Sequence, residues 1–159
     1  TYSELEQHLQ SLPREQPLAI WLEVAGEEFD APLGGLALAA EAGEASAANL
    51  GCEAAPWLEA LKPAVEDAAR PKTVHDSKRA FLVLQAAGIR PQGILHDTML
   101  YSYLLQPTTA NHTLDEVAVR HLNQRLSGAL AEKADFEPRR MDRAALTRRT
   151  GTPRRARCG

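Results

Sequence analysis

Apolar and polar positions along the chain follow two different periods, which divide it into predicted strands and helices. Short apolar runs bounded by Gly and Pro predict strands at 18–24, 33–40, 71–75 and 93–96. The run 45–52 fits a weak third strand, but its pattern leaves the assignment open. Apolar residues at helical spacing predict helices at 2–12, 56–69, 77–87, 97–105 and 113–121. Strands come first and then alternate with helices, which favours a mixed α/β sheet with helices on its faces.

Several helix ends carry recognisable signals. Asp97 stands immediately before a predicted helix, and a carboxylate there accepts the free amide hydrogens of the first turn, so we interpret it as an N-cap. Asp76 has the same place before the helix at 77–87, which Gly88 is expected to end. Tyr101, Leu104 and Leu105 are interpreted as core packing. Four histidines are expected at the surface or at helix ends; they are His75, His96, His112 and His121.

Length and composition restrict the class of protein. The chain has 159 residues, 44% hydrophobic and 25% charged, which suits one soluble globular domain. None of its apolar runs approaches the roughly 20 residues that a membrane span needs, so no membrane partner is expected. Cys52 and Cys158 lie far apart and form no metal or redox spacing. A reduced, cytoplasmic setting is the simplest interpretation.

The net charge of −3 conceals an asymmetry along the chain. Residues 137–159 contain eight Arg against Glu137 and Asp142, so the rest of the chain carries −9. We therefore predict a globular domain at 1–136 and an Arg-rich, disordered tail at 137–159. The abrupt change in composition suggests a non-native or out-of-frame C terminus. The alternative is a noncatalytic module that binds nucleic acid through the basic tail.

The segment 72–126 carries the most specific motifs. It contains Lys78-Arg79, then Gly88-Ile89, then His96-Asp97-Thr98-Met99-Leu100. These motifs resemble the middle of the 3′–5′ exonuclease domain of bacterial DNA polymerase I, a family A polymerase. The resemblance extends more weakly from about residue 2 to 135. It implies a ribonuclease H-like exonuclease fold, in which active members use acidic side chains to hold two divalent ions about 4 Å apart.

The resemblance also places the family's four acidic positions on this chain. They fall on Leu22 and Val24 in the first strand, on Ala80 in the helix after 71–75, and on Lys133 near the end of the domain. Leu, Val and Ala offer no metal ligand, and Lys repels a cation. The motifs therefore resemble a decayed version of the site. No catalytic residue and no cofactor are expected, and Mg²⁺ or Mn²⁺ would be needed only if the domain is active.

Two functional hypotheses follow from the resemblance. In the first, the domain has lost its nuclease activity and is retained as a structural module of a replication and repair polymerase. Its partners would be the polymerase domain of the same chain and single-stranded DNA. In the second, the domain is an active 3′–5′ proofreading exonuclease that uses other acids, namely Glu23, Asp76, Asp97 and Asp135.

Overall fold

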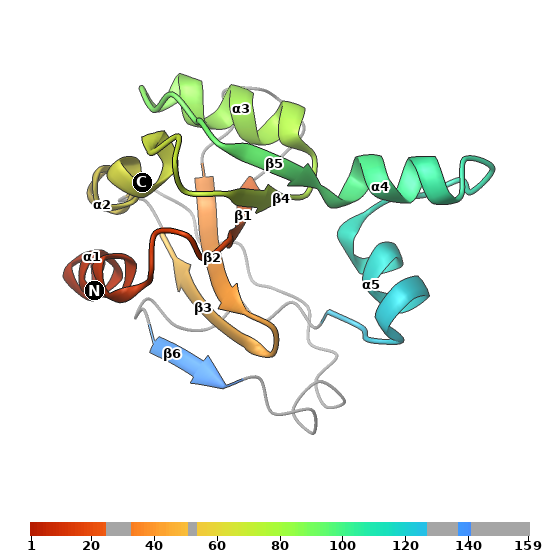
Figure 1. Cartoon of the computed structure of the whole chain (residues 1–159), viewed down its shortest axis with the longest axis horizontal. Helices are drawn as coiled ribbons and strands as arrows, with labels where there is room; N and C mark the ends of the chain where they lie inside the picture. The colour runs from red at the N-terminus through yellow and green to blue at the C-terminus, as the bar shows by residue number, and fades with distance from the viewer. Residues whose placement is uncertain (25–32, 51–53, 127–136, 141–159) are drawn as a thin grey trace, which may run out of the picture.

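A six-stranded mixed sheet organises the chain (Figure 1). The computed structural model describes residues 1–24, 33–50, 54–126 and 137–140. The strands lie in the order β5-β4-β1-β2-β3-β6. Their bounds are β1 Leu18–Val24, β2 Leu33–Glu41, β3 Glu44–Asn49, β4 Lys72–Val74, β5 Ile94–Asp97 and β6 Glu137–Arg140. The predicted mixed α/β architecture is therefore confirmed.

Strand β1 lies where the sheet changes from antiparallel to parallel pairing. It pairs antiparallel with β2, with Leu22 opposite Leu36, and parallel with β4, with Ile20 opposite Val74. Strands β4 and β5 are also parallel, which requires a crossover connection between them. Helix α3, Ser77–Ala86, supplies that crossover. The connection places β1, the start of α3 and the end of β5 close together in the fold.

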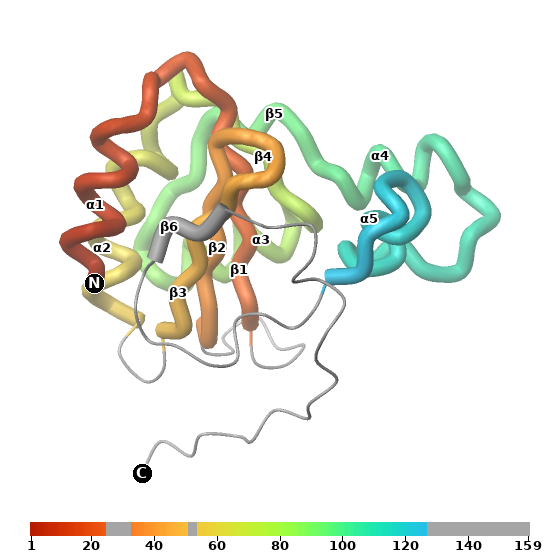
Figure 2. The backbone as a smooth tube through the Cα atoms, turned by 90° about the horizontal axis from the view of Figure 1, so that it is seen from below, coloured from red at the N-terminus to blue at the C-terminus, as the bar shows by residue number. Residues whose placement is uncertain are grey.

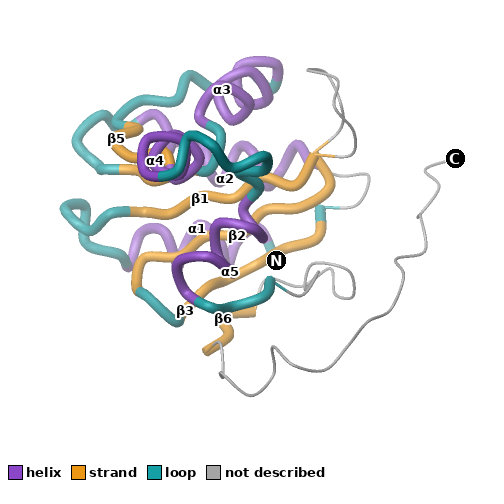
Figure 3. Tube along the Cα trace, turned by 90° about the vertical axis from the view of Figure 1, so that its right-hand side faces the viewer, coloured by secondary structure: helices purple, strands orange, loops and turns teal. Residues whose placement is uncertain are grey.

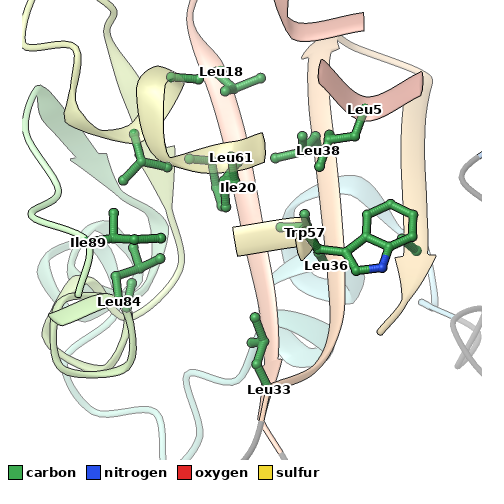
Figure 4. Close-up of a cluster of buried hydrophobic side chains, with 14 of the residues drawn as sticks. Leu5, Leu18, Ile20, Leu33, Leu36, Leu38, Trp57, Leu61, Leu84 and Ile89 are labelled. Carbon is green, nitrogen blue, oxygen red and sulfur yellow. The ribbon is translucent and has the colours of Figure 1, made fainter. Parts of the chain in front are cut away.

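Two helices from the first half of the chain cover one side of the sheet. Helices α1, Tyr2–Ser11, and α2, Ala54–Glu66, lie side by side (Figure 2). Their apolar residues recur at helical spacing, so each helix turns one stripe toward the strands. Leu5 of α1 and Leu61 and Val65 of α2 are fully buried there. Strand and helix side chains together form one hydrophobic core (Figure 4).

The remaining two helices form a projection that we call the α4–α5 arm. Helix α4, Thr98–Leu105, continues directly from β5, and α5, Leu114–Leu122, packs against it. The arm lies on the opposite side of the sheet from α1 and α2 (Figures 2 and 3). Its interior is mainly polar. Arg120 donates a hydrogen bond to Ser102 Oγ, which lies 2.8 Å from His112 Nδ1.

The structure corrects several sequence expectations. Tyr101, Leu104 and Leu105 are exposed rather than in the core, because α4 projects from the sheet and, among the described elements, packs mainly against α5. His112 is predicted at the surface or at a helix end; it directly precedes the N-cap of α5 but is buried, with its ring stacked on that of Tyr103 at a centre-to-centre distance of 3.7 Å.

The edge of the sheet beyond β2 also differs from expectation. The ambiguous run at 45–52 forms β3 over Glu44–Asn49. Glu137–Arg140 form β6 and pair with β3, whereas the sequence predicted a disordered tail from residue 137. The backbone pairing of these four residues accounts for the difference. Residues 141–159 lie outside the described part of the chain.

Candidate functional site

The two family acidic positions that the resemblance places on β1 hold apolar side chains that face the core. Leu22 and Val24 of β1 are half-buried and pack against the hydrophobic core. Glu23 lies between them and is exposed, as the alternation of side chains along a strand predicts. The register with β2 shifts between Glu23 and Val24. Strand β1 thus directs its single acidic side chain away from the core side.

The family acidic position that the resemblance places on α3 is also occupied by a core residue. Ala80 lies in the first turns of α3 and is buried in the same cluster that Leu22 and Val24 contact. Asp76 stands one residue before α3, in a left-handed conformation with φ 63°, and its Oδ1 accepts a hydrogen bond from the backbone nitrogen of Arg79. Asp76 is therefore the N-cap of α3, as predicted from the sequence.

Asp97 is the most extensively bonded acid of the region. It is the N-cap of α4, and its Oδ1 accepts hydrogen bonds from the backbone nitrogens of Met99 at 2.8 Å and Leu100 at 3.2 Å. The same carboxylate accepts a 3.2 Å bond at Oδ1 from the backbone nitrogen of Asp76 and a 2.7 Å bond at Oδ2 from that of Ser77. The N-cap predicted from the sequence is confirmed, and it caps the loop before α3 as well.

The electrostatics of Asp97 follow from this bonding. Burial by itself raises the pKa of the carboxyl group, but the hydrogen bonds from Ser77, Leu100 and Met99 outweigh it, so the pKa lies below its ordinary value. The carboxylate is therefore ionised at neutral pH and accepts hydrogen bonds from four backbone amides, three at Oδ1 and one at Oδ2. A divalent ion would compete with these donors for the carboxylate oxygens.

His75 also lies beside this site, a position that the sequence analysis, which expected it at the surface or at a helix end, did not predict. Its Nδ1 lies 2.8 Å from Thr98 Oγ1, and its ring lies 6.2 Å from that of Trp21. Burial lowers the pKa of His75, and the nearby Asp97 opposes this effect. The ring is thus held between β1 and the start of α4. Only its position at the end of the predicted strand 71–75 hinted at this role.

The described residues at these positions do not fit a two-metal centre. Such a centre needs several oxygen ligands from separate elements, whereas Leu22, Val24 and Ala80 supply none. Within the described ranges, no group of three or more His, Cys, Asp or Glu residues is placed to hold a metal ion. Of the alternative acids, the structure brings Asp76 and Asp97 together and leaves Glu23 exposed. Lys133 and Asp135 lie outside the described residues.

Comparison with known proteins identifies the fold and its family. The model of the DNA polymerase I ribonuclease H-like domain matches residues 21–128, which is more than half of the chain. DNA polymerase I of Geobacillus stearothermophilus is 36% identical over 108 residues, covering 65% of this chain. DNA polymerase I of Mycobacterium bovis is 36% identical over 67 residues, or 42% of the chain.

Solved structures agree with this assignment. A structure described as the POL domain of Pol1 from M. smegmatis, in complex with DNA primer-template and dNTP, has a TM-score of 0.62 and 29% identity, covering 80% of this chain and 22% of that one. Brucella melitensis NrnC with bound Mg²⁺ has a TM-score of 0.59 at 24% identity, covering 84% of this chain and 64% of that one, and shows the shared fold.

The fold is therefore that of the ribonuclease H-like exonucleases. More particularly, the chain belongs to the family of the DNA polymerase I ribonuclease H-like domain, the 3′–5′ exonuclease domain of bacterial DNA polymerase I. The chain spans 12% of the Geobacillus polymerase and 7% of the Mycobacterium bovis polymerase. Among the described residues, no helix combines the length and apolar character needed to cross a membrane.

Proposed function

We propose that this domain has lost metal-dependent exonuclease chemistry and acts as a structural module of a DNA polymerase I. One observation carries the proposal. Leu22, Val24 and Ala80, the residues on which the resemblance places three of the family's acidic positions, pack in or against one hydrophobic core. Apolar residues are favoured at such positions of a strand or helix when no bound metal offsets the cost of burying a charged side chain.

The neighbouring acids support the same conclusion. Asp97 uses both carboxylate oxygens to hold amide hydrogens at the starts of α3 and α4. Asp76 caps α3, and Glu23 is exposed. Asp76 and Asp97 therefore have capping roles that the fold requires, so they are unsuited to serve as interchangeable metal ligands. A fold that has lost its chemistry can still support a neighbouring domain.

The test is a nuclease assay with the purified chain. A 3′-recessed duplex and a single-stranded DNA, both labelled at the 5′ end, are incubated with Mg²⁺, Mn²⁺ or EDTA. The proposal expects no shortening in any condition. A ladder that shortens from the 3′ end and disappears with EDTA would overturn it.

Substitutions separate true activity from contamination. If a ladder appears, Asp76→Asn and Glu23→Gln are assayed beside the unsubstituted chain. Loss of cleavage in either variant would establish an active exonuclease with different ligands, whereas unchanged cleavage in both would leave Asp97, Asp135 or a contaminating nuclease as its source. DNA binding that falls steeply with salt and disappears when residues 141–159 are deleted would instead favour a noncatalytic binding module.

A further inference from the structure

The outer edge of β3 is covered by a strand from a part of the chain that lies outside the matched family domain. Strand β3 pairs with β2 on one side and with β6 on the other, where β6 ends the sheet (Figure 1). The family match covers residues 21–128, which include β3 but not Glu137–Arg140 of β6. Segment 137–140 therefore covers an edge that the described strands of the matched domain leave unpaired.

The pairing with β2 shows which amides of β3 are already used. The backbone nitrogen of Leu50 donates a hydrogen bond to the backbone oxygen of Gly34. Hydrogen-bonded pairs recur at every second residue of an antiparallel ladder, and the same register continues through Ala48 and Ser46. The amides of Ala48 and Ser46 therefore point to β2.

The alternate amides of β3, those of Ala45 and Ala47, point to β6. Ala45 pairs with Arg139 and Ala47 pairs with Glu137, so these two are the hydrogen-bonded pairs of the ladder between β3 and β6. Pro138 lies between them, at a pair that exchanges no hydrogen bond, so its missing N–H costs nothing. A shift of one residue would put the proline where a donor is needed. The sequence of the segment thus fits this edge in the observed register.

The charge of the edge favours a basic segment. Glu44 is the charged residue of β3, and Glu41 of β2 pairs with it at the hairpin end. The register places Arg140 opposite Glu44, and opposite charges at such positions stabilise a strand pair. Residues 137–159 carry +6 and the rest of the chain carries −9. An extended segment that contains arginine is therefore the occupant that this edge suits.

Segment 137–140 is held weakly enough to be replaced. Strand β6 has four residues, and among the described elements it packs mainly against β3. Its two hydrogen-bonded pairs must offset the conformational entropy lost when four residues are ordered, so the net stability of the pairing is small. The edge is thus occupied by a segment that another extended peptide can displace.

We propose that the outer edge of β3 is a docking site for an extended basic peptide segment, and that residues 137–140 occupy it as a displaceable cap. The docked segment forms main-chain hydrogen bonds with Ala45 and Ala47 and adds a strand to the sheet. With the cap in place, the edge is also closed to strand pairing with a second copy of the chain. The proposal is independent of the proposed function, which concerns positions on β1 and α3.

The experiment measures competition between the cap and a peptide of the same sequence. A fluorescein-labelled peptide of residues 137–143 is titrated with the full chain and with its Arg139→Pro variant, and fluorescence anisotropy reports binding. Arg139→Pro removes the amide that pairs with Ala45, so the cap is released and the edge becomes available. We expect the variant to bind the peptide at least about tenfold more tightly than the unsubstituted chain, in which the tethered segment competes at a high effective concentration.

Matched controls make the test specific. Arg148→Pro introduces the same change beyond β6 and should bind the peptide as weakly as the unsubstituted chain. A peptide that is N-methylated at Arg139 keeps its charge but lacks the amide donor, so it should not bind. Amide exchange measured by NMR should slow at Ala47 when the peptide binds and stay unchanged at Ala48, whose amide points to β2. Circular dichroism compares the folding of each variant with that of the unsubstituted chain.

Three results would overturn the proposal. They are equal or absent peptide binding by the unsubstituted chain and Arg139→Pro, binding of the N-methylated peptide as tight as that of its parent, and self-association of Arg139→Pro that excludes the peptide. Sedimentation velocity detects the last result, which would assign the edge to a second copy of the chain. None of them bears on nuclease activity, so failure of peptide docking and failure of the proposed function can be told apart.

Discussion

Oδ2 of Asp97 accepts a 2.7 Å hydrogen bond from the backbone nitrogen of Ser77, and this bond joins the start of α4 to the start of α3. The two residues are separated by the whole of α3 and β5 in the sequence. One carboxylate therefore fixes the relative position of two helices beside the candidate site. This capping role accounts for the acid at position 97 without any metal chemistry.

Replacing Asp97 with Ala should destabilise the domain. The substitution leaves the amides of Ser77, Met99 and Leu100 without their acceptor, and we expect a loss of about 3 kcal/mol in the free energy of unfolding. Urea unfolding at neutral pH measures this loss. A loss below about 1 kcal/mol would contradict the assigned capping role.

The contribution of Asp97 should also depend on pH. Its pKa in the folded chain lies below the ordinary value of 3.8, so the ionised form is favoured by folding. The stabilisation is fully present above pH 3.8 and is lost as the pH falls through the lowered native pKa. The difference in unfolding free energy between the unsubstituted chain and Asp97→Asn should therefore shrink at the acidic end. An unchanged difference down to pH 2 would contradict this linkage.

Gly93→Ala should be far more damaging than substitution of another glycine with positive φ. Gly93 has φ 67°, and a Cβ atom there would lie 2.7 Å from the backbone oxygen of Arg70. We expect a loss of about 3 kcal/mol, which combines backbone strain with steric overlap. Gly43→Ala is the matched control, because Gly43 has φ 89° and open space around it. It should cost about 1 kcal/mol in the same urea measurement. Equal losses for the two variants would contradict the steric argument.

Lys72 should make stability rise with pH in the alkaline range. The residue is fully buried, and its Nζ donates hydrogen bonds to the backbone oxygens of Asp67 at 2.6 Å and Arg70 at 2.9 Å. Burial lowers its pKa from the ordinary 10.5, and the carboxylate of Asp67 opposes this. The unfolded chain therefore binds more protons between the lowered pKa and 10.5, and stability increases with pH through that window.

Lys72→Met tests this linkage. The variant lacks the titrating group, so the unsubstituted chain should gain stability relative to it as the pH approaches 10.5. At neutral pH the variant should be less stable by about 2 kcal/mol, because two backbone oxygens lose their donor. Chemical unfolding of both proteins across the alkaline range gives both quantities. Parallel pH profiles would contradict the lowered pKa of Lys72.

Restoring one acid should destabilise the chain without creating a metal site. Leu22→Asp buries part of a carboxylate against the core, and we expect a loss of about 2 kcal/mol. Addition of 10 mM MgCl₂ should not recover the midpoint of thermal unfolding, because one carboxylate cannot hold the ion. Glu23→Ala, at an exposed position, is the control and should change stability by less than about 0.5 kcal/mol. Recovery of Leu22→Asp by Mg²⁺ would reveal further ligands near β1 and contradict the proposed loss of the site.

Local signals made much of this structure predictable. An Asp before a helix and a Gly after one give the same backbone chemistry in almost any fold, so the caps at Asp76 and Asp97 and the end of α3 near Gly88 followed from sequence. Strand periodicity likewise separated Leu22 and Val24 from Glu23. The family motifs then placed these elements in the correct fold class.

What the sequence by itself determined is therefore the order of elements, their caps and the face of β1 on which each residue lies, because these depend on neighbours within a few residues. Only the tertiary structure decided where the long-range partners lie. It buries Lys72 against backbone oxygens, joins Ser77 to Asp97, and leaves Leu104 on a projecting arm. Whether a residue is buried depends on which elements pack together in the fold. The spacing of apolar residues in α4 is the same whether the helix packs in the core or projects from it, so the sequence could not distinguish the two.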